Sequence, residues 1–278
     1  MKSLLLSSLF LFFGVKANSQ VLDSTTVKKF LEKFAEPAGE IISGSVLSTA
    51  NTHGGIPHFA GGAGVGFLSV KTTNPIDTTQ EFRSVIPTSF LYGSLGITKG
   101  LQLGPGAGGI GSLDLLARFG FFPMRGDYGD VADKSPLLYG GGVKVGLLRH
   151  GIVSPAISGT TTYTFLKDAE FTFTSAGDVG KTSFDLSTWS IHFDVSKSFL
   201  IVAPYLGLGW DFHRLKASYE VNFSDPLLPD QSGAYTVKPK TSRFYGGGEL
   251  TLALLKFYLE GGKTGDHGYF SIGAKAGI

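Results

Sequence analysis

The sequence of 278 residues contains no cysteine. This absence excludes a disulfide framework, a thiolate metal site and lipidation of an N-terminal cysteine. Long apolar runs are also lacking, because no stretch after residue 19 approaches the roughly 20 apolar residues that a membrane-spanning helix requires. The fold therefore has to be stabilised by its topology, without covalent crosslinks.

An excess of charge of one sign is missing as well. The chain has 24 Lys and Arg against 22 Asp and Glu, and removal of residues 1–19 takes away Lys2 and Lys16, which leaves 22 of each. A formal net charge of zero predicts no nucleic-acid partner. The remaining 259 residues (278 minus 19) suffice for one large β domain or two ordinary ones.

The N-terminus has the pattern of a secretory signal peptide. Residues 1–3 carry a positive charge, residues 4–15 form an apolar run, and residues 17–19 are Ala-Asn-Ser, ahead of Gln20. Small residues at these places are typical of a cleavage site. We predict that residues 1–19 are removed when the protein is exported; an uncleaved N-terminal anchor helix is the less favoured alternative.

The segment 20–55 contains the one clear helical pattern. Apolar residues recur at helical spacing over residues 23–36, namely Val27, Phe30, Leu31 and Phe34. Asp23 and Ser24 are candidate caps, and the Pro-Ala-Gly at 37–39 is expected to end the helix. We predict a short amphipathic helix in a plug or linker segment. The alternative is a simple N-terminal packing helix.

From residue 56 onward apolar residues alternate with a period of two, and many of the 40 glycines lie within these runs. Trp189 and Ile191, for example, alternate with Ser190 and His192. Such alternation is typical of strands, and glycine within strands helps to curve a sheet toward closure. The expected strands lie near residues 57–71, 84–98, 111–123, 137–149, 153–166, 184–197, 200–214, 241–254, 256–263 and 267–278.

The connections distinguish a membrane barrel from a soluble sandwich. Long links are expected at 72–83, 124–136, 167–183 and 215–240, and tight turns near 150–152, 198–199 and Leu255. Long loops at one end and short turns at the other are typical of outer-membrane barrels. Only the link 99–110 departs from this pattern. We predict an all-β fold over residues 56–278, an antiparallel transmembrane β-barrel of about ten strands, within a range of roughly 8 to 14.

Glycine-rich strand motifs and two further segments carry a resemblance to a known class of proteins. They are Gly62 to Gly66, Tyr139 to Gly142, Pro204 to Trp210 and Tyr245 to Gly248, with Phe30 to Phe34 and Leu186 to Trp189. In these motifs the chain resembles bacterial outer-membrane β-barrel proteins of an uncharacterised family, distantly similar to fatty-acid-transporter-type barrels. The resemblance covers nearly the whole mature chain. It implies the outer membrane of a Gram-negative bacterium, contact with membrane lipid and insertion by the outer-membrane assembly machinery.

Charged and polar residues on the predicted inward faces are the candidate lumen lining. They are Asp114, Arg118, Lys144, His192, Asp194, Asp211, Glu249 and Glu260. Their mixed signs suit a lumen that conducts polar solutes, and they also suit an ion-paired, largely closed lumen, because side chains fill much of so small a barrel. We assign no catalytic, cofactor-binding or metal-binding residue.

A hydrolytic site is a weaker alternative. Its candidate residues are Ser190, His192, Asp194, Asp211 and His213. The expected register places His192 near Ala203 and His213 about ten residues, or roughly 33 Å, farther along the strand, which argues against one site. The remaining histidines show no coherent metal-ligand spacing, and the GxGxxG match at 104–109 is not followed by a helix that could bind a phosphate.

The sequence thus favours a non-enzymatic barrel that transports or conducts small molecules, hydrophobic ones among them. A small hydrophobic ligand is then an expected partner, and no cofactor is expected. A structural or docking barrel for a periplasmic or secreted partner is the second hypothesis. A lipid-modifying outer-membrane enzyme is the third.

Overall fold

The structure is a computed structural model that describes residues 24–44, 47–73, 81–104, 108–121, 136–152, 154–175, 178–224 and 229–277. The predicted signal peptide lies outside the described residues. The elements are helix α2 (Ser24–Ser43) and strands β1 (Phe59–Thr73), β2 (Glu81–Thr98), β3 (Leu101–Gln102), β4 (Gly109–Ile110), β5 (Ser112–Phe121), β6 (Leu137–Leu148), β7 (Ala156–Ser175), β8 (Asp178–Ser196), β9 (Val202–Asn222), β10 (Gln231–Val237), β11 (Lys240–Leu252), β12 (Leu255–Thr264) and β13 (His267–Gly277).

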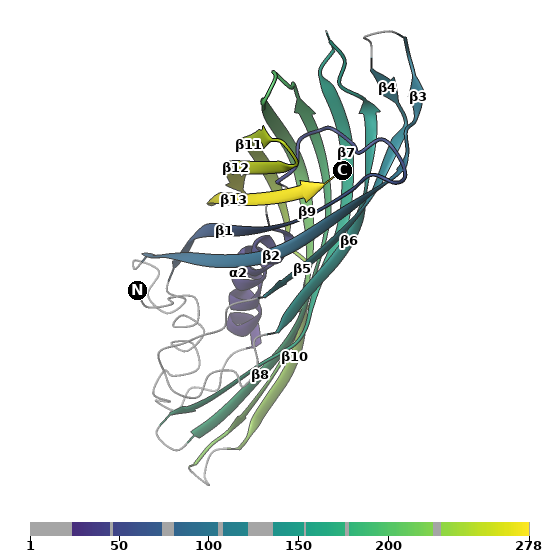
Figure 1. Cartoon of the computed structure of the whole chain (residues 1–278). Coiled ribbons are helices and arrows are strands. Elements are labelled where there is room, and N and C mark those ends of the chain that lie inside the picture. Colours follow the sequence, from purple (N-terminus) through teal and green to yellow (C-terminus); the bar gives the residue numbers. More distant parts are fainter. Residues whose placement is uncertain are drawn as a thin grey trace.

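The strands form one antiparallel sheet that closes on itself (Figure 1). Strands β1, β2, β5, β6, β7, β8, β9, β11, β12 and β13 follow one another around the ring, and β13 pairs with β1 to close it. β9 pairs with β11 along its first half and with β10 along its second half, so β10 and β11 share one position in the wall. The predicted ten-strand antiparallel barrel is therefore confirmed. The irregular link 99–110 contains a separate small hairpin of β3 and β4.

Three strands are much longer than the alternation predicted. β7, β8 and β9 have 20, 19 and 21 residues, about twice the 9 to 11 residues that a crossing needs. The predicted long links 167–183 and 215–240 were too extensive, because β7 to β10 occupy much of both. A bulge between Leu166 and Ala169, with Asp168 at φ 54°, interrupts the period-two pattern of β7 and hid its continuation.

Helix α2 continues past Pro37 to Ser43, so the predicted end at 37–39 is wrong. An internal proline removes a backbone hydrogen bond. Tertiary packing outweighs this cost, because Ala38 and Ile42, both beyond the proline, are buried against the barrel. Within the part of the chain that the structure describes, no helix is long and apolar enough to cross a membrane.

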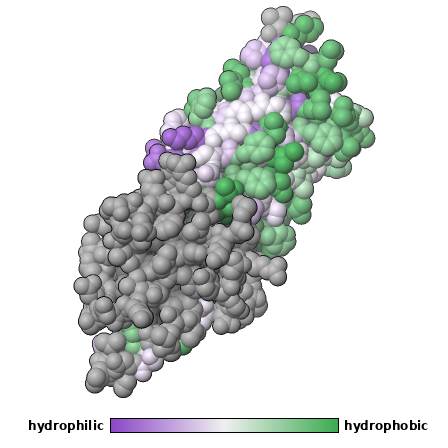
Figure 2. Space-filling model, turned by 90° about the vertical axis from the view of Figure 1, so that its left-hand side faces the viewer, coloured by the Kyte–Doolittle hydropathy of each residue, from purple (hydrophilic) through white to green (hydrophobic). Residues whose placement is uncertain are grey.

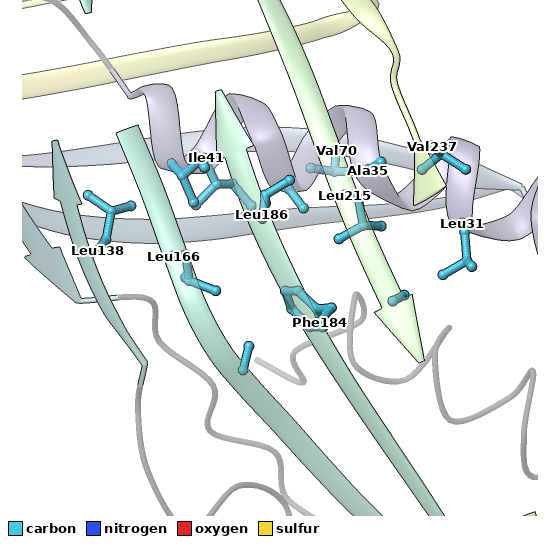
Figure 3. Packing of buried hydrophobic residues seen from close by; sticks show 14 of the residues in the cluster. Leu31, Ala35, Ile41, Val70, Leu138, Leu166, Phe184, Leu186, Leu215 and Val237 are labelled. Atoms are coloured by element: carbon cyan, nitrogen blue, oxygen red, sulfur yellow. The ribbon is translucent and has the colours of Figure 1, made fainter. Parts of the chain in front are cut away.

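The helix packs against the inner face of β8 and β9 at one end of the barrel. Figure 3 shows the apolar cluster between them, in which the labelled residues are Leu31, Ala35, Ile41, Val70, Leu138, Leu166, Phe184, Leu186, Leu215 and Val237. Phe34 of the helix lies edge-on to Phe184, with ring centroids 5.6 Å apart. This end of the lumen is therefore closed by a hydrophobic contact.

Candidate functional site in the plugged lumen

After helix α2 the chain runs through the lumen before β1 begins at Phe59. The N–H of Leu47 donates to Glu260 Oε2 over 2.9 Å, and the N–H of Ala50 donates to Ser196 Oγ over 3.1 Å. Leu47 and Ala50 are each only 1% exposed. We call helix α2 together with residues 47–55 the plug, because these residues are enclosed by the barrel wall.

The far end of the plug is bonded to strand β5. Thr52 Oγ1 lies 2.6 Å from Ser112 Oγ, and the N–H of His53 donates to Asp114 Oδ2 over 2.9 Å. The ring Nε2 of His53 also lies 2.6 Å from Ser94 Oγ on β2. Side chains of the wall thus form the hydrogen bonds that this segment, which has no regular secondary structure, cannot form within itself.

Two arginines from opposite sides of the ring hold the C-terminal end of helix α2. Gly44, in the left-handed conformation at φ 57°, follows the last helical residue. Arg243 on β11 donates to the Gly44 carbonyl and to Ser43 Oγ, and Arg118 on β5 donates to the Ser43 carbonyl. Guanidinium groups suit this position because the last carbonyls of a helix carry partial negative charge. Arg243 Nε also donates to Asp211 Oδ2 over 2.9 Å, so one side chain joins plug and wall.

Tyrosine hydroxyls hold three acidic side chains of the lumen. Tyr205 and Tyr269 donate to Glu260 over 3.0 and 2.9 Å. The other two pairs are Tyr245 with Asp194 and Tyr258 with Glu249. These tyrosines are not among the candidate lumen residues predicted from sequence. Their place in the strand alternation was the signal that could have found them.

Three cations lie around the other side of the lumen, on β5, β6 and β13. Arg118 stacks on the Phe90 ring, with its Cζ 4.2 Å from the centroid. Lys144 Nζ donates to Ser48 Oγ of the plug over 2.8 Å. Lys275 Nζ lies 4.5 Å from the centre of the Tyr258 ring, and it has no hydrogen bond or ion pair with any other described residue.

A cavity of about 100 Å³ remains between the plug and strands β2, β5, β6 and β7. Its lining includes Gly141 of β6 and the threonines Thr160, Thr162 and Thr164 of β7. A single water needs about 10 to 15 Å³ on this measure. The cavity therefore has room for several waters or for one small molecule. We call it the lumen cavity.

The structure buries seven of the eight predicted lumen residues to 4% exposure or less. They are Asp114, Lys144, His192, Asp194, Asp211, Glu249 and Glu260. The eighth, Arg118, is partly buried beneath the helix end. Among the eight, Asp211 and His192 come into contact, whereas each of the others bonds to the plug, to a tyrosine or to Lys256.

The expected register of β8 and β9, which spoke against a shared site around His192, is wrong. β8 and β9 pair His192 with Gly209 and not with Ala203, so Asp211 is the next inward residue along β9. His192 Nε2 lies 3.4 Å from Asp211 Oδ1, and Ser190 stands opposite Asp211. Ser190 and His192 both approach the carboxylate, and the structure shows no hydrogen bond between the two in the described region. A nucleophile paired with a base is therefore not formed.

The remaining candidate for the hydrolytic site, His213, lies where helix α2 packs against the wall. Its Nδ1 lies 2.8 Å from Thr188 Oγ1 and its Nε2 lies 3.1 Å from Thr241 Oγ1. The Thr188 hydroxyl also donates to the Gly39 carbonyl of α2 over 3.3 Å. Within the described ranges, no three His, Cys, Asp or Glu residues are grouped so that they could hold a metal ion.

Two titratable groups of the plug are buried with it. Burial raises the pKa of Glu40 to about 9, against the opposing influence of Arg243 and of a hydrogen bond from Thr264. Burial also lowers the pKa of His53 to about 4, and nearby Lys275 adds to this effect. Both side chains are therefore neutral near pH 7, as expected for groups enclosed in a barrel.

The outer surface carries large apolar side chains where a water-soluble protein would carry polar ones. Trp189 is 48% exposed, Leu206 54% and Phe244 62%. Figure 2 shows hydrophobic residues gathered over the upper part of one face. A closed barrel with a polar interior and such an exterior is suited to lipid. The protein is an outer-membrane-type β-barrel.

Comparison with known proteins adds no narrower assignment to this barrel. No protein-family model and no curated protein sequence matches the chain. Among solved structures, the barrel is similar to a deltaS2 mutant of the TodX monoaromatic hydrocarbon channel, with a TM-score of 0.32 and 7% identity over 79% of this chain and 89% of that one. It is also similar to a loop L8 deletion mutant of OmpT, an outer membrane protein of Vibrio cholerae, with a TM-score of 0.21 and 11% identity over 79% and 98% of the two chains.

Proposed function

We propose that the chain is exported through a cleaved signal peptide, residues 1–19, and works in the outer membrane of a Gram-negative bacterium as a transport barrel for small molecules, hydrophobic ones among them. Its partners are then membrane lipid, the outer-membrane assembly machinery during insertion, and a small ligand in transit. In this proposal the eight candidate lumen residues line the route, and four of them, Asp114, Arg118, Lys144 and Glu260, hold the plug across it.

The observation that carries the proposal is the position of Phe90 on β2. Phe90 lines the lumen cavity, and it also lines an apolar groove on the lipid-facing side of β1, β2, β12 and β13. The wall is thin here, because Gly64 and Gly273 lack side chains and Leu47 of the plug lies close to both. The pairing of β13, β1 and β2 is unbroken at these residues, so a route from lipid past Phe90 to the lumen cavity requires these strands to separate locally.

Onward passage requires the plug to move, because residues 47–55 are bonded to the wall beyond the cavity. The bonds of Leu47, Ala50 and His53 to wall side chains are separate contacts, each worth about 0.5 to 1.5 kcal/mol net. The segment shifts when these bonds break together with those of Ser48, Thr52 and the His53 ring to the wall. A plug held in this way supports gated passage and not a permanently open pore.

An uptake assay tests the proposal in cells whose outer membrane excludes the hydrophobic fluorophore N-phenylnaphthylamine. Expression of the wild-type barrel should raise the uptake rate above that of cells without it, and Phe90→Ala should raise it several-fold further. Leu95→Ala is the matched control, because Leu95 is a lipid-facing residue of the same strand, is 39% exposed and lies outside the groove. Equal uptake with and without the barrel, for wild type and for Phe90→Ala, would refute the transport function.

A docking barrel is the second candidate, favoured by the length of β7, β8 and β9. With 19 to 21 residues each, they exceed a membrane crossing by about ten residues. The excess, together with β10, forms a wall that is available for a protein partner. Deletion of that excess should abolish partner capture and leave fluorophore uptake unchanged if docking is the function.

A further inference from the structure

We propose that the lumen cavity is a binding site for a small carboxylate anion. Its lining includes three cations, Arg118, Lys144 and Lys275, and a single acid, Asp114, among the described residues. The site lies at a defined place in the fold, between the plug and the inner face of β2, β5, β6 and β7. No residue of this site is shared with the lipid-facing groove except Phe90.

The lining of the lumen cavity itself contains more cations than acids. The acids Asp194, Glu249 and Glu260 accept hydrogen bonds from tyrosines, and Asp211 pairs with Arg243. Those acids are therefore engaged by other partners. Lys275 packs on an aromatic ring, and the acids that attract it, Glu249 and Asp114, form no ion pair or hydrogen bond with it.

Unpaired hydrogen-bond donors point into the same cavity. Thr160, at 4% exposure, and Tyr92 both line it, and neither hydroxyl has a hydrogen-bond partner in the described part of the chain. Arg118 Nε is likewise without one there. Buried polar groups are rarely left unpaired in a native protein. Two hydroxyls and a guanidinium N–H, with Lys275 in the lining of the same cavity, form a donor set that matches the acceptor oxygens of a carboxylate.

The size of the cavity limits the length of the ligand. A volume of about 100 Å³ holds a molecule of a few heavy atoms, and a long acyl chain would not fit unless the plug moved. Phe90 and Leu116 provide an apolar part of the lining for a short hydrocarbon end. A short-chain carboxylate such as propionate fits both the charge and the size.

Equilibrium binding tests this site separately from transport, since it requires no flux. Propionate and its neutral analogue propionamide are titrated into the purified barrel in detergent and followed by ligand-observed NMR. We expect propionate to bind at least tenfold more tightly than propionamide. Lys275→Met should reduce propionate affinity at least tenfold, whereas Lys263→Met, at a side chain 64% exposed to solvent, should leave it unchanged.

The near-isosteric variant Thr160→Val decides the question if Lys275→Met does not fold. It removes one unpaired donor while keeping the shape, so it should weaken propionate binding several-fold in a barrel with unchanged circular dichroism. Equal affinities for propionate and propionamide would overturn the proposal. Absence of binding by both, in folded protein, would also overturn it and would indicate that water fills the cavity.

Discussion

The Arg243 guanidinium and the Asp211 carboxylate form a buried ion pair across β9 and β11, with Nη2 and Oδ2 separated by 2.8 Å. The same guanidinium donates to Ser43 and Gly44 at the end of helix α2. One side chain therefore neutralises a buried acid of the wall and holds the plug. Loss of this side chain should affect both.

Arg243→Ala should lower the free energy of unfolding by about 3 to 5 kcal/mol, because it leaves the Asp211 carboxylate buried without its cation. Urea unfolding in lipid vesicles measures this change. Lys263→Ala, at an exposed site, should change stability by less than about 0.5 kcal/mol. If both variants unfold at the same urea concentration, the ion pair does not have the stabilising role assigned to it.

Gly39→Ala separates the stability of the helix from its docking. Alanine favours the isolated helix by about 1 kcal/mol, yet a Cβ at Gly39 would overlap the His213 ring. We expect the clash to prevail, so that limited proteolysis cuts the plug faster than in wild type. Gly248→Ala is the control, because no atom lies within 4 Å of its added Cβ. Unchanged proteolysis of Gly39→Ala would contradict the close approach.

Glu40 makes the stability of the folded protein fall as pH rises. Its pKa rises from 4.5 when unfolded to about 9 when folded, so its contribution to stability is full below pH 4.5 and is lost as pH rises toward 9. The apparent Tm of wild type should therefore fall between pH 5 and pH 9 relative to that of Glu40→Gln, which cannot ionise. Parallel Tm profiles for the two proteins would exclude Glu40 as the cause.

Stability at acid pH depends on His53, whose pKa in the folded protein is about 4, below the ordinary 6.5. Its contribution is present above pH 6.5 and is lost as pH falls through 4. His53→Gln should therefore lose less stability than wild type between pH 7 and pH 4, as measured by the same Tm profiles. A larger loss in the variant would reverse the assigned sign.

Strict alternation made seven strands predictable to within about three residues, namely β1, β2, β5, β6, β11, β12 and β13. The turn between β8 and β9 shows why register was not predictable. Phe199 pairs with Val202 across an apex at Leu200, which has φ 51°. An apolar residue in that conformation gives no turn signal in sequence. The expected turn therefore lies two residues too early, and the expected neighbour of His192, Ala203, lies six residues from its actual partner Gly209.

The path of the plug was also beyond sequence reasoning. Residues 47–55 have no period, and their positions depend on backbone groups bonded to side chains far away in sequence, such as Leu47 with Glu260. The lumen residues themselves were accessible, because charges alternating with apolar residues mark an inward face. The partner of each charged residue could not be predicted, because it depends on the strand register and on the path of the plug.

Movement of the plug is the central claim of the proposed function, and a reversible tether tests it most directly. Thr52 Oγ1 and Ser112 Oγ lie 2.6 Å apart, so cysteines at both positions bring two sulfurs within reach of a disulfide. The chain has no other cysteine. The control pair replaces Ser183 and Ser218, whose hydroxyl oxygens are 2.7 Å apart on β8 and β9.

The measurement is N-phenylnaphthylamine uptake by cells that carry each double variant, before and after oxidation and again after reduction. We predict that oxidation of the Thr52→Cys/Ser112→Cys barrel lowers uptake to the level of cells without the protein, and that reduction restores it. The Ser183→Cys/Ser218→Cys barrel should keep its uptake throughout. Undiminished uptake by the fully oxidised plug tether would contradict a moving plug.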